Sequence, residues 1–228
     1  MLKKTLLLST LVALIQVGFA QQKNDWANFG KYESANIAVK ALPASQRKVV
    51  FMGNSITEGW VKADSSFFKD NGFIGRGISG QVTSQMLVRF RQDVIALQPQ
   101  AVVILAGTND IAENQGPISL ENIFGNIVSM IELAKFHKIK VIVSSVLPAS
   151  EYRWRPGMQP AIKIPKLNAM LEDYCKKNKV VYADYFKKMA NADNGLDEEL
   201  SKDGVHPTLA GYKIMESVIL PLTKSVAR

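Results

Sequence analysis

The chain has 228 residues, enough for one or two domains, and its 47% hydrophobic and 21% charged residues exclude a disordered or low-complexity protein. A single cysteine, Cys175, excludes a disulfide framework and a cysteine-based zinc site. The formal net charge is +8, but the basic residues are scattered and form only short clusters, so no nucleic-acid partner is expected.

The first twenty residues are typical of a signal peptide. A basic start at Lys3 and Lys4 precedes a mostly apolar run, and small residues stand at the −3 and −1 positions of a cut after Ala20. The run is short for a bilayer span, and no cysteine near the cut supports lipid attachment. We therefore predict that residues 1–20 direct export to the periplasm or out of the cell. Residues 21–228 are then one domain, with no stable membrane insertion after cleavage.

Residues 25–40 are predicted to form a helix that packs on the core. Trp26, Phe29, Tyr32 and Ile37 recur in this segment at roughly helical spacing. We expect these four side chains to make ordinary core contacts.

An alternation of apolar runs and helical patterns follows. The predicted strands are 48–52, 73–78, 101–106, 140–146 and 180–183, and the predicted helices are 81–97, 120–137, 164–177 and 208–224. Continuous β-branched runs separated by helices indicate a parallel sheet covered on both faces, which predicts one doubly wound α/β domain. Ligands of such sheets bind beyond the carboxyl ends of the strands, so the informative residues are those that follow each strand.

Ser55 follows the first predicted strand in the sequence GNSIT. A serine at a strand-to-helix turn has the exposed position that a nucleophile needs, although serine at this place is also a common helix cap. The second glycine of the G-x-S-x-G motif is missing, which argues against an ordinary α/β-hydrolase.

A candidate base and its acid stand near the other end, at His206 and Asp203 in the sequence DGVHP. Neutral histidine is the usual base for serine, and a carboxylate can hold its ring in the required tautomer. The alternative is that Asp203 only caps the following helix. The second histidine, His137, is expected at a helix end on the opposite edge of the sheet, where it does not compete for this role.

Two further loops carry candidate oxyanion donors. The stretch GRGISG matches G-x-G-x-x-G but overlaps the second strand, and the acidic residue expected about twenty positions later is absent, so nucleotide binding is not expected. Gly80 instead lets a backbone N–H approach a ligand closely. Asn109, in the sequence GTND after the third strand, is either a turn residue or a side-chain donor to an oxyanion.

The blocks GNSIT, RGISGQVTSQML, LAGTND and DGVHP together resemble the four sequence blocks of the GDSL, or SGNH, hydrolases. The resemblance implies a flavodoxin-like, three-layer α/β/α sandwich with strand order 2-1-3-4-5. It also implies a serine esterase that uses no metal and no cofactor. The longer sequence FMGNSITEGW resembles bacterial esterases grouped with platelet-activating-factor acetylhydrolase-like and carbohydrate acetylesterase proteins.

This resemblance also assigns roles to individual residues. It implies Ser55 as the nucleophile, His206 as the base and Asp203 as the triad acid. The oxyanion hole would be formed by Ser55, Gly80 and Asn109. The family's usual acidic residue before the serine is Asn54 in this chain, so a different local hydrogen-bond network is expected.

The substrate is indicated only by the loop EYRWRPG after the fourth strand. Its Trp154 and Arg153 are candidates for stacking on and contacting a sugar, or else the tryptophan merely packs on the domain. No long apolar lid is evident, which argues against a lipase. We predict an exported esterase that removes a short acyl group, acetyl above all, from a carbohydrate or similar small-molecule alcohol. The alternatives are a lysophospholipase or thioesterase acting on lipid acyl esters, and a non-catalytic carbohydrate-binding relative.

Overall fold

The computed structural model describes residues 25–226, so the predicted signal peptide lies outside the described residues. Five parallel strands form one sheet in the order β2-β1-β3-β4-β5, as the family resemblance implied. The strands are β1 (Val49–Gly53), β2 (Phe73–Gly77), β3 (Ala101–Ile104), β4 (Lys140–Ser144) and β5 (Val181–Ala183). Every strand that the sequence predicts is present, with small differences at the ends.

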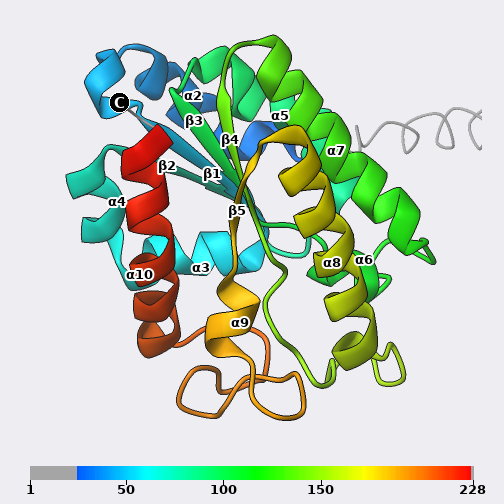
Figure 1. Ribbon diagram of the computed structural model, residues 1–228. Helices are drawn as coiled ribbons and strands as arrows, with labels where there is room; N and C mark the ends of the chain where they lie inside the picture. The colour runs from blue at the N-terminus through cyan, green and yellow to red at the C-terminus, as the bar shows by residue number, and fades with distance from the viewer. Residues whose placement is uncertain (1–24, 227–228) are drawn as a thin grey trace, which may run out of the picture.

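Helices cover both faces of this sheet and complete the predicted three-layer α/β/α sandwich (Figure 1). One face packs against α5 (Thr83–Asp93), α7 (Leu120–Phe136) and α8 (Pro160–Asn178). The other packs against α3 (Ser55–Ala63), α4 (Ser65–Asn71), α9 (Tyr185–Met189) and α10 (Leu209–Val226). Alternate strand residues enter the two cores, since Val50 and Met52 face one core and Val49 and Phe51 the other.

Two helices between β1 and β2 have no predicted bounds in the sequence analysis. Helix α3 begins directly after β1, where the side chain of Asn54 accepts a hydrogen bond of 3.0 Å from the backbone N–H of Ile56. Helix α4 begins after Asp64, whose side chain accepts one of 3.1 Å from the N–H of Phe67. Both are N-terminal caps that satisfy otherwise unpaired donors, which is why the chain turns into helices at these points.

The prediction for residues 25–40 is wrong in its packing. Only α2 (Glu33–Lys40) is α-helical, and a short 3₁₀ helix, η1 (Phe29–Tyr32), precedes it. Trp26, Phe29 and Ile37 are 45%, 39% and 68% exposed. The residue that α2 buries is polar: Asn36 is 3% exposed, and its side chain donates to Asp93 and accepts from Arg76.

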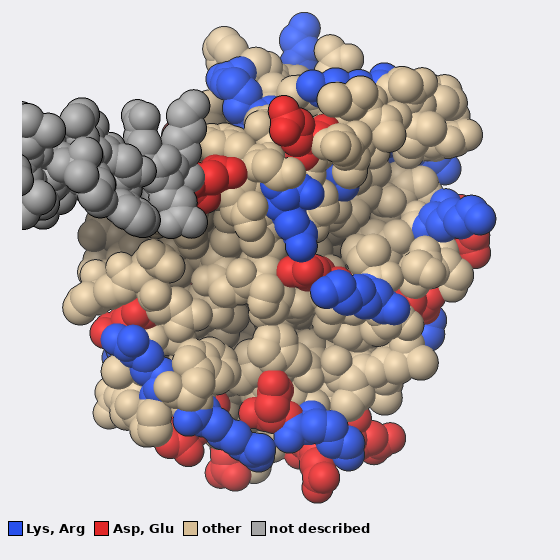
Figure 2. Space-filling model, turned by 180° about the vertical axis from the view of Figure 1, so that it is seen from behind, with Lys and Arg blue, Asp and Glu red and all other residues tan. Residues whose placement is uncertain are grey.

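The surface carries charges of both signs. Figure 2 shows Lys and Arg side chains interspersed with Asp and Glu on the face seen there, without a continuous basic stripe. Within residues 25–226, no helix has both the length and the apolar character that a bilayer crossing requires.

Candidate active site

Ser55 and His206 are brought together at the carboxyl edge of the sheet, although 151 positions separate them in the chain. The Oγ atom of Ser55 lies 2.8 Å from Nε2 of His206. Because Asn54 caps α3, Ser55 is the first residue of the helix and its hydroxyl is not used as the cap. The hydroxyl can therefore donate its proton to the imidazole.

Asp203 holds the other nitrogen of the His206 ring. Its Oδ2 atom lies 2.6 Å from Nδ1 of His206, while its Oδ1 accepts hydrogen bonds from the backbone N–H groups of Val205 at 2.9 Å and His206 at 2.8 Å. Partial burial opposes ionisation of Asp203, but the His206 ring and these backbone donors outweigh it and lower the pKa well below its usual range. A carboxylate that stays ionised keeps Nδ1 protonated and leaves Nε2 free to accept the serine proton.

His137 lies away from this group. It follows the last residue of α7, shortly before β4 begins, and so stands at the amino edge of the sheet. Its Nε2 is 3.5 Å from Nη1 of Arg91. The structure therefore gives Ser55 one imidazole partner, His206.

The three candidate oxyanion donors are the backbone N–H groups of Ser55 and Gly80 and the side-chain amide of Asn109. Gly80 has a φ of +78°, a left-handed conformation that favours glycine, and a Cβ added there would meet no atom within 4 Å. Within residues 25–226, no backbone carbonyl accepts a hydrogen bond from the N–H of Gly80 or of Ser55. The side chain of Asn109 is buried, donates one hydrogen at 2.9 Å to the carbonyl of Gln81 and accepts from Asn114 at 3.1 Å. These two bonds fix its amide orientation.

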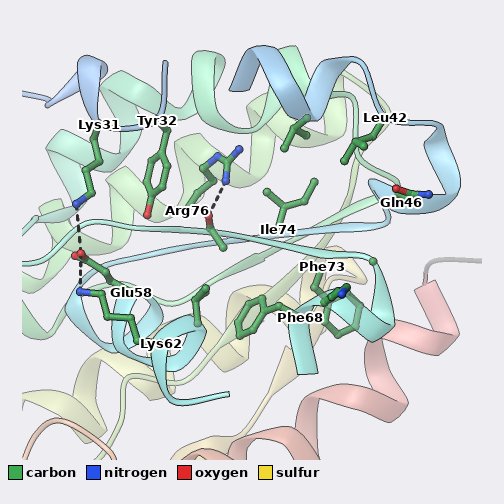
Figure 3. Close-up of a pocket in the computed structure, with 15 residues that line it drawn as sticks. Lys31, Tyr32, Leu42, Gln46, Glu58, Lys62, Phe68, Phe73, Ile74 and Arg76 are labelled. Carbon is green, nitrogen blue, oxygen red and sulfur yellow. Dashed lines mark hydrogen bonds and ion pairs between the residues drawn. The ribbon is translucent and has the colours of Figure 1, made fainter. Parts of the chain in front are cut away.

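The loop that carries Gly80 is held by Glu58 of α3. One carboxylate oxygen of Glu58 accepts from the backbone N–H of Ser79 at 2.8 Å, and the other receives Lys31 at 3.3 Å and Lys62 at 3.1 Å. Figure 3 shows these two lysines on either side of Glu58. Partial burial raises the pKa of Glu58, but the Ser79 N–H and both lysines lower it below its usual value. Because α3 begins with Ser55, Glu58 connects the Gly80 loop to the helix of the candidate nucleophile.

A buried guanidinium also connects the Gly80 loop to the turn before Ser55. Arg89 of α5 is fully buried, and its Nη2 donates to the carbonyl of Gly53 at 3.0 Å, two residues before the serine. Its Nε donates to the side chain of Gln81 at 2.5 Å, one residue after Gly80. Asp93, also buried, neutralises its charge at 2.8 Å. Arg89 therefore fixes the spacing between the nucleophile turn and the Gly80 loop.

A second buried carboxylate follows Asn109. Asp110 is 1% exposed and accepts hydrogen bonds from the backbone N–H and the hydroxyl of Thr83. Burial raises the pKa of Asp110 to about 6, although the Thr83 hydrogen bonds act in the opposite direction. The contact joins the start of α5 to the short helix α6 (Thr108–Ile111) that carries Asn109.

The two predicted substrate residues lie beside this site. The indole of Trp154 is 47% exposed, stacks on Tyr152 with ring centroids 4.9 Å apart, and donates at 3.3 Å to Asn114, the partner of Asn109. Arg153 lines a cavity of about 530 Å³ that Asp203 also lines. The loop after β4 therefore flanks the catalytic groups.

Another cavity lies away from this site. It measures about 580 Å³, lies along the outer edge of β2, and is lined by residues such as Tyr32, Phe68 and Arg76 (Figure 3). Its lining contains no member of the Ser55–His206–Asp203 group. In the described part of the chain, no group of three or more His, Cys, Asp or Glu side chains is arranged to hold a metal ion.

The sequence analysis did not identify Glu58, Gln81 and Arg89 as parts of this edge. The order of residues in α5 gave one signal, because Arg89 stands between Val88 and Phe90 in an otherwise amphipathic helix. The structure buries the arginine completely and leaves Val88 48% exposed. Charged residues are rarely fully buried unless they are paired. The sequence pattern alone therefore favours a helix orientation with Val88 buried and Arg89 exposed.

The chain is similar in sequence and structure to several known proteins. A solved structure of a GDSL-like lipase from Bacteroides thetaiotaomicron is 50% identical, covers 88% of this chain and 99% of its own, and superposes with a TM-score of 0.85. The uncharacterized lipoprotein YqeF of Bacillus subtilis (strain 168) is 29% identical over 168 residues, which are 62% of this chain and 69% of that protein.

A more distant likeness is one of fold alone. The acetylxylan esterase Axe2 of Geobacillus stearothermophilus has a TM-score of 0.62 at 20% identity, over 79% of this chain and 95% of its own.

The profile of the GDSL-like Lipase/Acylhydrolase family matches residues 51–214, from the first strand to the last helix. The chain belongs to the GDSL-like lipase/acylhydrolase family and is an ester hydrolase.

Proposed function

We propose that the protein is a serine esterase that removes a short acyl group, acetyl above all, from a carbohydrate or similar alcohol. The observation that carries this proposal is the hydrogen-bonded series Ser55–His206–Asp203, with contacts of 2.8 Å and 2.6 Å. In this mechanism Ser55 is the nucleophile, His206 the general base and Asp203 the residue that orients it.

The chemistry proceeds in two halves. Nε2 of His206 takes the Ser55 proton as Oγ bonds to the ester carbonyl carbon, and the carbonyl oxygen becomes an oxyanion. The N–H groups of Ser55, Gly80 and Asn109 stabilise that charge, which is larger in the transition state than in the substrate. The intermediate expels the alcohol, which takes the proton from Nε2, and leaves an acyl-enzyme.

Water then hydrolyses the acyl-enzyme by the same steps. It gives a proton to Nε2 of His206 and attacks the acyl carbon, and a second tetrahedral intermediate forms at the same donors. When this intermediate collapses, the acid is released and Oγ of Ser55 recovers its proton from Nε2. The products are one alcohol and one carboxylic acid, and the enzyme returns to its starting state.

A short acyl group and a polar alcohol fit the surroundings best. The cavity beside Asp203 is lined mainly by polar and charged residues, among them Ser150, Glu151 and Arg153. Trp154 offers an exposed aromatic ring next to Asn114 and Asn109. The family fold is shared with acetylxylan esterases, which adds support for a carbohydrate ester.

The test is Ser55→Ala, with fluorophosphonate labelling and p-nitrophenyl acetate hydrolysis as readouts. We expect both to be lost while the circular dichroism spectrum is unchanged. His206→Ala should be nearly as damaging, and His137→Ala is the matched control that keeps both activities. Labelling that survives in Ser55→Ala would assign the nucleophile elsewhere, and a wild-type protein that never reacts would support a carbohydrate-binding relative.

Acyl-chain profiling tests the substrate side. A sugar deacetylase should prefer p-nitrophenyl acetate and lose activity on octanoyl esters, whereas a lysophospholipase or thioesterase should show the opposite preference. Release of acetate from acetylated polysaccharides then identifies the alcohol.

We also propose that residues 21–228 form a single exported domain after removal of residues 1–20. The support is the sequence pattern of the first twenty residues. The Bacillus subtilis relative is named a lipoprotein, which accords with export. Amino-terminal sequencing of the protein from the periplasm or culture medium tests both the location and the cut before Gln21.

A further inference from the structure

A second polar cavity adjoins the Gly80 loop on the side of the N-terminal segment. It measures about 440 Å³, and its lining includes Trp26, Asn28, Gly80, Gln85 and Gln115. Three separate parts of the chain therefore form it: the segment before η1, the Gly80 loop with the start of α5, and the loop after α6. Because Gly80 is one of the proposed oxyanion donors, the cavity opens beside the reacting ester.

Trp26 is exposed but held in position. Its indole Nε1 donates to the side chain of Gln115 at 3.4 Å, and its backbone carbonyl accepts from Gln85 at 2.7 Å. The next residue, Ala27, is 2% exposed, and its carbonyl accepts from Gln81 at 2.8 Å. A large aromatic ring that is anchored on both sides and left 45% exposed is suited to contact a ligand.

The chemistry of the lining selects an uncharged, hydroxyl-rich ligand. The side chains of Asn28 and Gln115 present amide donors and acceptors, and among the described residues that line the cavity there is the acidic Asp25 but no Lys or Arg. A phosphate headgroup finds no positive charge partner among these described residues. In the described part of the lining the one aliphatic side chain, Ile78, is 5% exposed, so it offers an acyl chain little apolar surface. A sugar ring matches both the indole face and the amides.

The two exposed tryptophans are anchored on neighbouring residues. Trp26 donates to Gln115, and Trp154 donates to Asn114, whose side chain in turn donates to Asn109. Both indoles are therefore hydrogen-bonded to the loop that follows the proposed oxyanion asparagine, Trp26 from the N-terminal segment and Trp154 from the loop after β4. This arrangement gives an oligosaccharide two aromatic contacts beside one reacting centre.

We propose that Trp26 and Gln115 form a sugar-binding subsite that holds a carbohydrate ring of an acetylated oligosaccharide next to the Gly80 loop. The inference rests on the proposed esterase function and adds to it a substrate class and a position. It also gives the N-terminal segment, which the sequence analysis assigned to the core, a place on the substrate-binding surface.

The experiment compares Trp26→Ala with the wild type on p-nitrophenyl acetate and on acetylated xylo-, manno- and gluco-oligosaccharides. We expect the ratio of kcat/KM for the preferred oligosaccharide to kcat/KM for p-nitrophenyl acetate to fall about tenfold, mainly through KM, because one ring contact is lost. Trp26→Phe should recover part of the ratio. Phe136→Ala is the control, since Phe136 is 82% exposed at the end of α7 and away from the site.

Binding is measured separately in the Ser55→Ala protein by calorimetry with the same oligosaccharides. The subsite predicts weaker binding when Trp26→Ala is added and unchanged binding when Phe136→Ala is added. An unchanged ratio and unchanged binding would overturn the subsite, as would a wild type that hydrolyses p-nitrophenyl acetate but none of the oligosaccharides. Failure of the esterase function has a different signature, because p-nitrophenyl acetate hydrolysis would then persist in Ser55→Ala.

Discussion

Asn109 has one amide hydrogen left for an oxyanion, because the other is donated to the carbonyl of Gln81. A donor of this kind binds the tetrahedral oxygen better than the planar carbonyl, so its contribution appears mainly in kcat. Removing one such donor costs about 10²–10³ in kcat. We predict this loss for Asn109→Ala, with KM little changed, measured by steady-state hydrolysis of p-nitrophenyl acetate.

Asn109 also links two loops, so stability must be measured beside turnover. The variant loses hydrogen bonds to Gln81 and Asn114, and a lower melting temperature is expected on that account. Fluorophosphonate labelling of Ser55 should persist at a reduced rate. A variant that melts early but has a normal kcat in its folded fraction would reduce Asn109 to a structural role.

The carboxyl of Asp110 predicts an unusual pH dependence of stability. Its pKa is raised to about 6 in the folded protein, from an ordinary value of 3.8, so the folded state binds more protons than the unfolded state between these values. The free energy of unfolding therefore falls as the pH rises through this window, by up to about 3 kcal/mol for this group, and is then constant above it.

The variant Asp110→Asn isolates this effect. It keeps the shape of the side chain and cannot titrate, so its stability relative to the wild type should be higher at pH 8 than at about pH 4. Urea unfolding of both proteins at the two pH values measures the difference. Asp203 acts in the opposite sense, since its lowered pKa adds stability that is lost in acid, but it is present in both proteins and cancels. A difference that does not change with pH would contradict the raised pKa.

At the scale of elements, α5 carries the contact that spaces the nucleophile turn from the Gly80 loop. In Arg89→Lys a single ammonium replaces a planar group that donates to Gly53, Gln81 and Asp93 at once. We predict a loss of about 2–3 kcal/mol in the free energy of unfolding, because buried acceptors lose their partners. We also predict slower fluorophosphonate labelling of the folded protein.

The matched control is Arg91→Lys, two positions further along the same helix. Arg91 is exposed and contacts His137 at the opposite edge, so both stability and labelling should remain as in the wild type. The labelling rate separates positioning from simple stabilisation. If Arg89→Lys is less stable but its folded fraction is labelled at the wild-type rate, the arginine does not position the reacting groups.

The same scale shows what the sequence could predict. Strands β1 and β3 were found because their residues are continuously apolar and buried on both faces, which leaves few other arrangements. Segment 25–40 was mistaken because Trp26 precedes the helical residues and Phe29 lies in a 3₁₀ helix, so the assumed 3.6-residue spacing does not apply. Buried polar groups such as Asn36 give no periodic signal, since they are buried only where hydrogen-bond partners from other segments meet them.

The candidate site also contains residues that the sequence predicts and residues that it does not. Ser55, Gly80, Asn109 and His206 each follow a strand or precede the last helix, so the rule for parallel sheets is enough to gather them at one edge. The groups that hold them in place, such as Glu58 and Arg89, come from helix interiors. Their role depends on which side of the helix meets the loop, and that is decided by tertiary contacts.

At the scale of the whole molecule, α3 and α10 are far apart in the sequence but pack against each other. They are the helices that follow Ser55 and His206. Trp60 of α3 stacks on Tyr212 of α10 with centroids 5.6 Å apart, and its indole donates to Glu216 at 3.2 Å. The hydroxyl of Tyr212 donates to the carbonyl of Ile56 at 2.8 Å. These contacts fix the helix that begins with Ser55 against the helix that follows His206.

We predict that Trp60→Ala lowers the free energy of unfolding by about 3–5 kcal/mol, the cost typical of a large ring removed from a core. Chemical denaturation measures it. Trp154→Ala is the comparison for stability, because that indole is 47% exposed and its removal leaves no internal cavity, so a loss below about 1 kcal/mol is expected. Similar losses of unfolding free energy in the two variants would contradict the assignment of Trp60 to the contact between α3 and α10.

The distance of 151 residues between Ser55 and His206 also has a consequence during protein synthesis. Strand β1 and Ser55 leave the ribosome well before His206 and helix α10, which follows it. A growing chain therefore lacks the pair until His206 has been made, and contacts of such long sequence separation form slowly. If the pair carries out the proposed mechanism, the chain hydrolyses no ester before α10 has docked, and the onset of ester cleavage reports that docking.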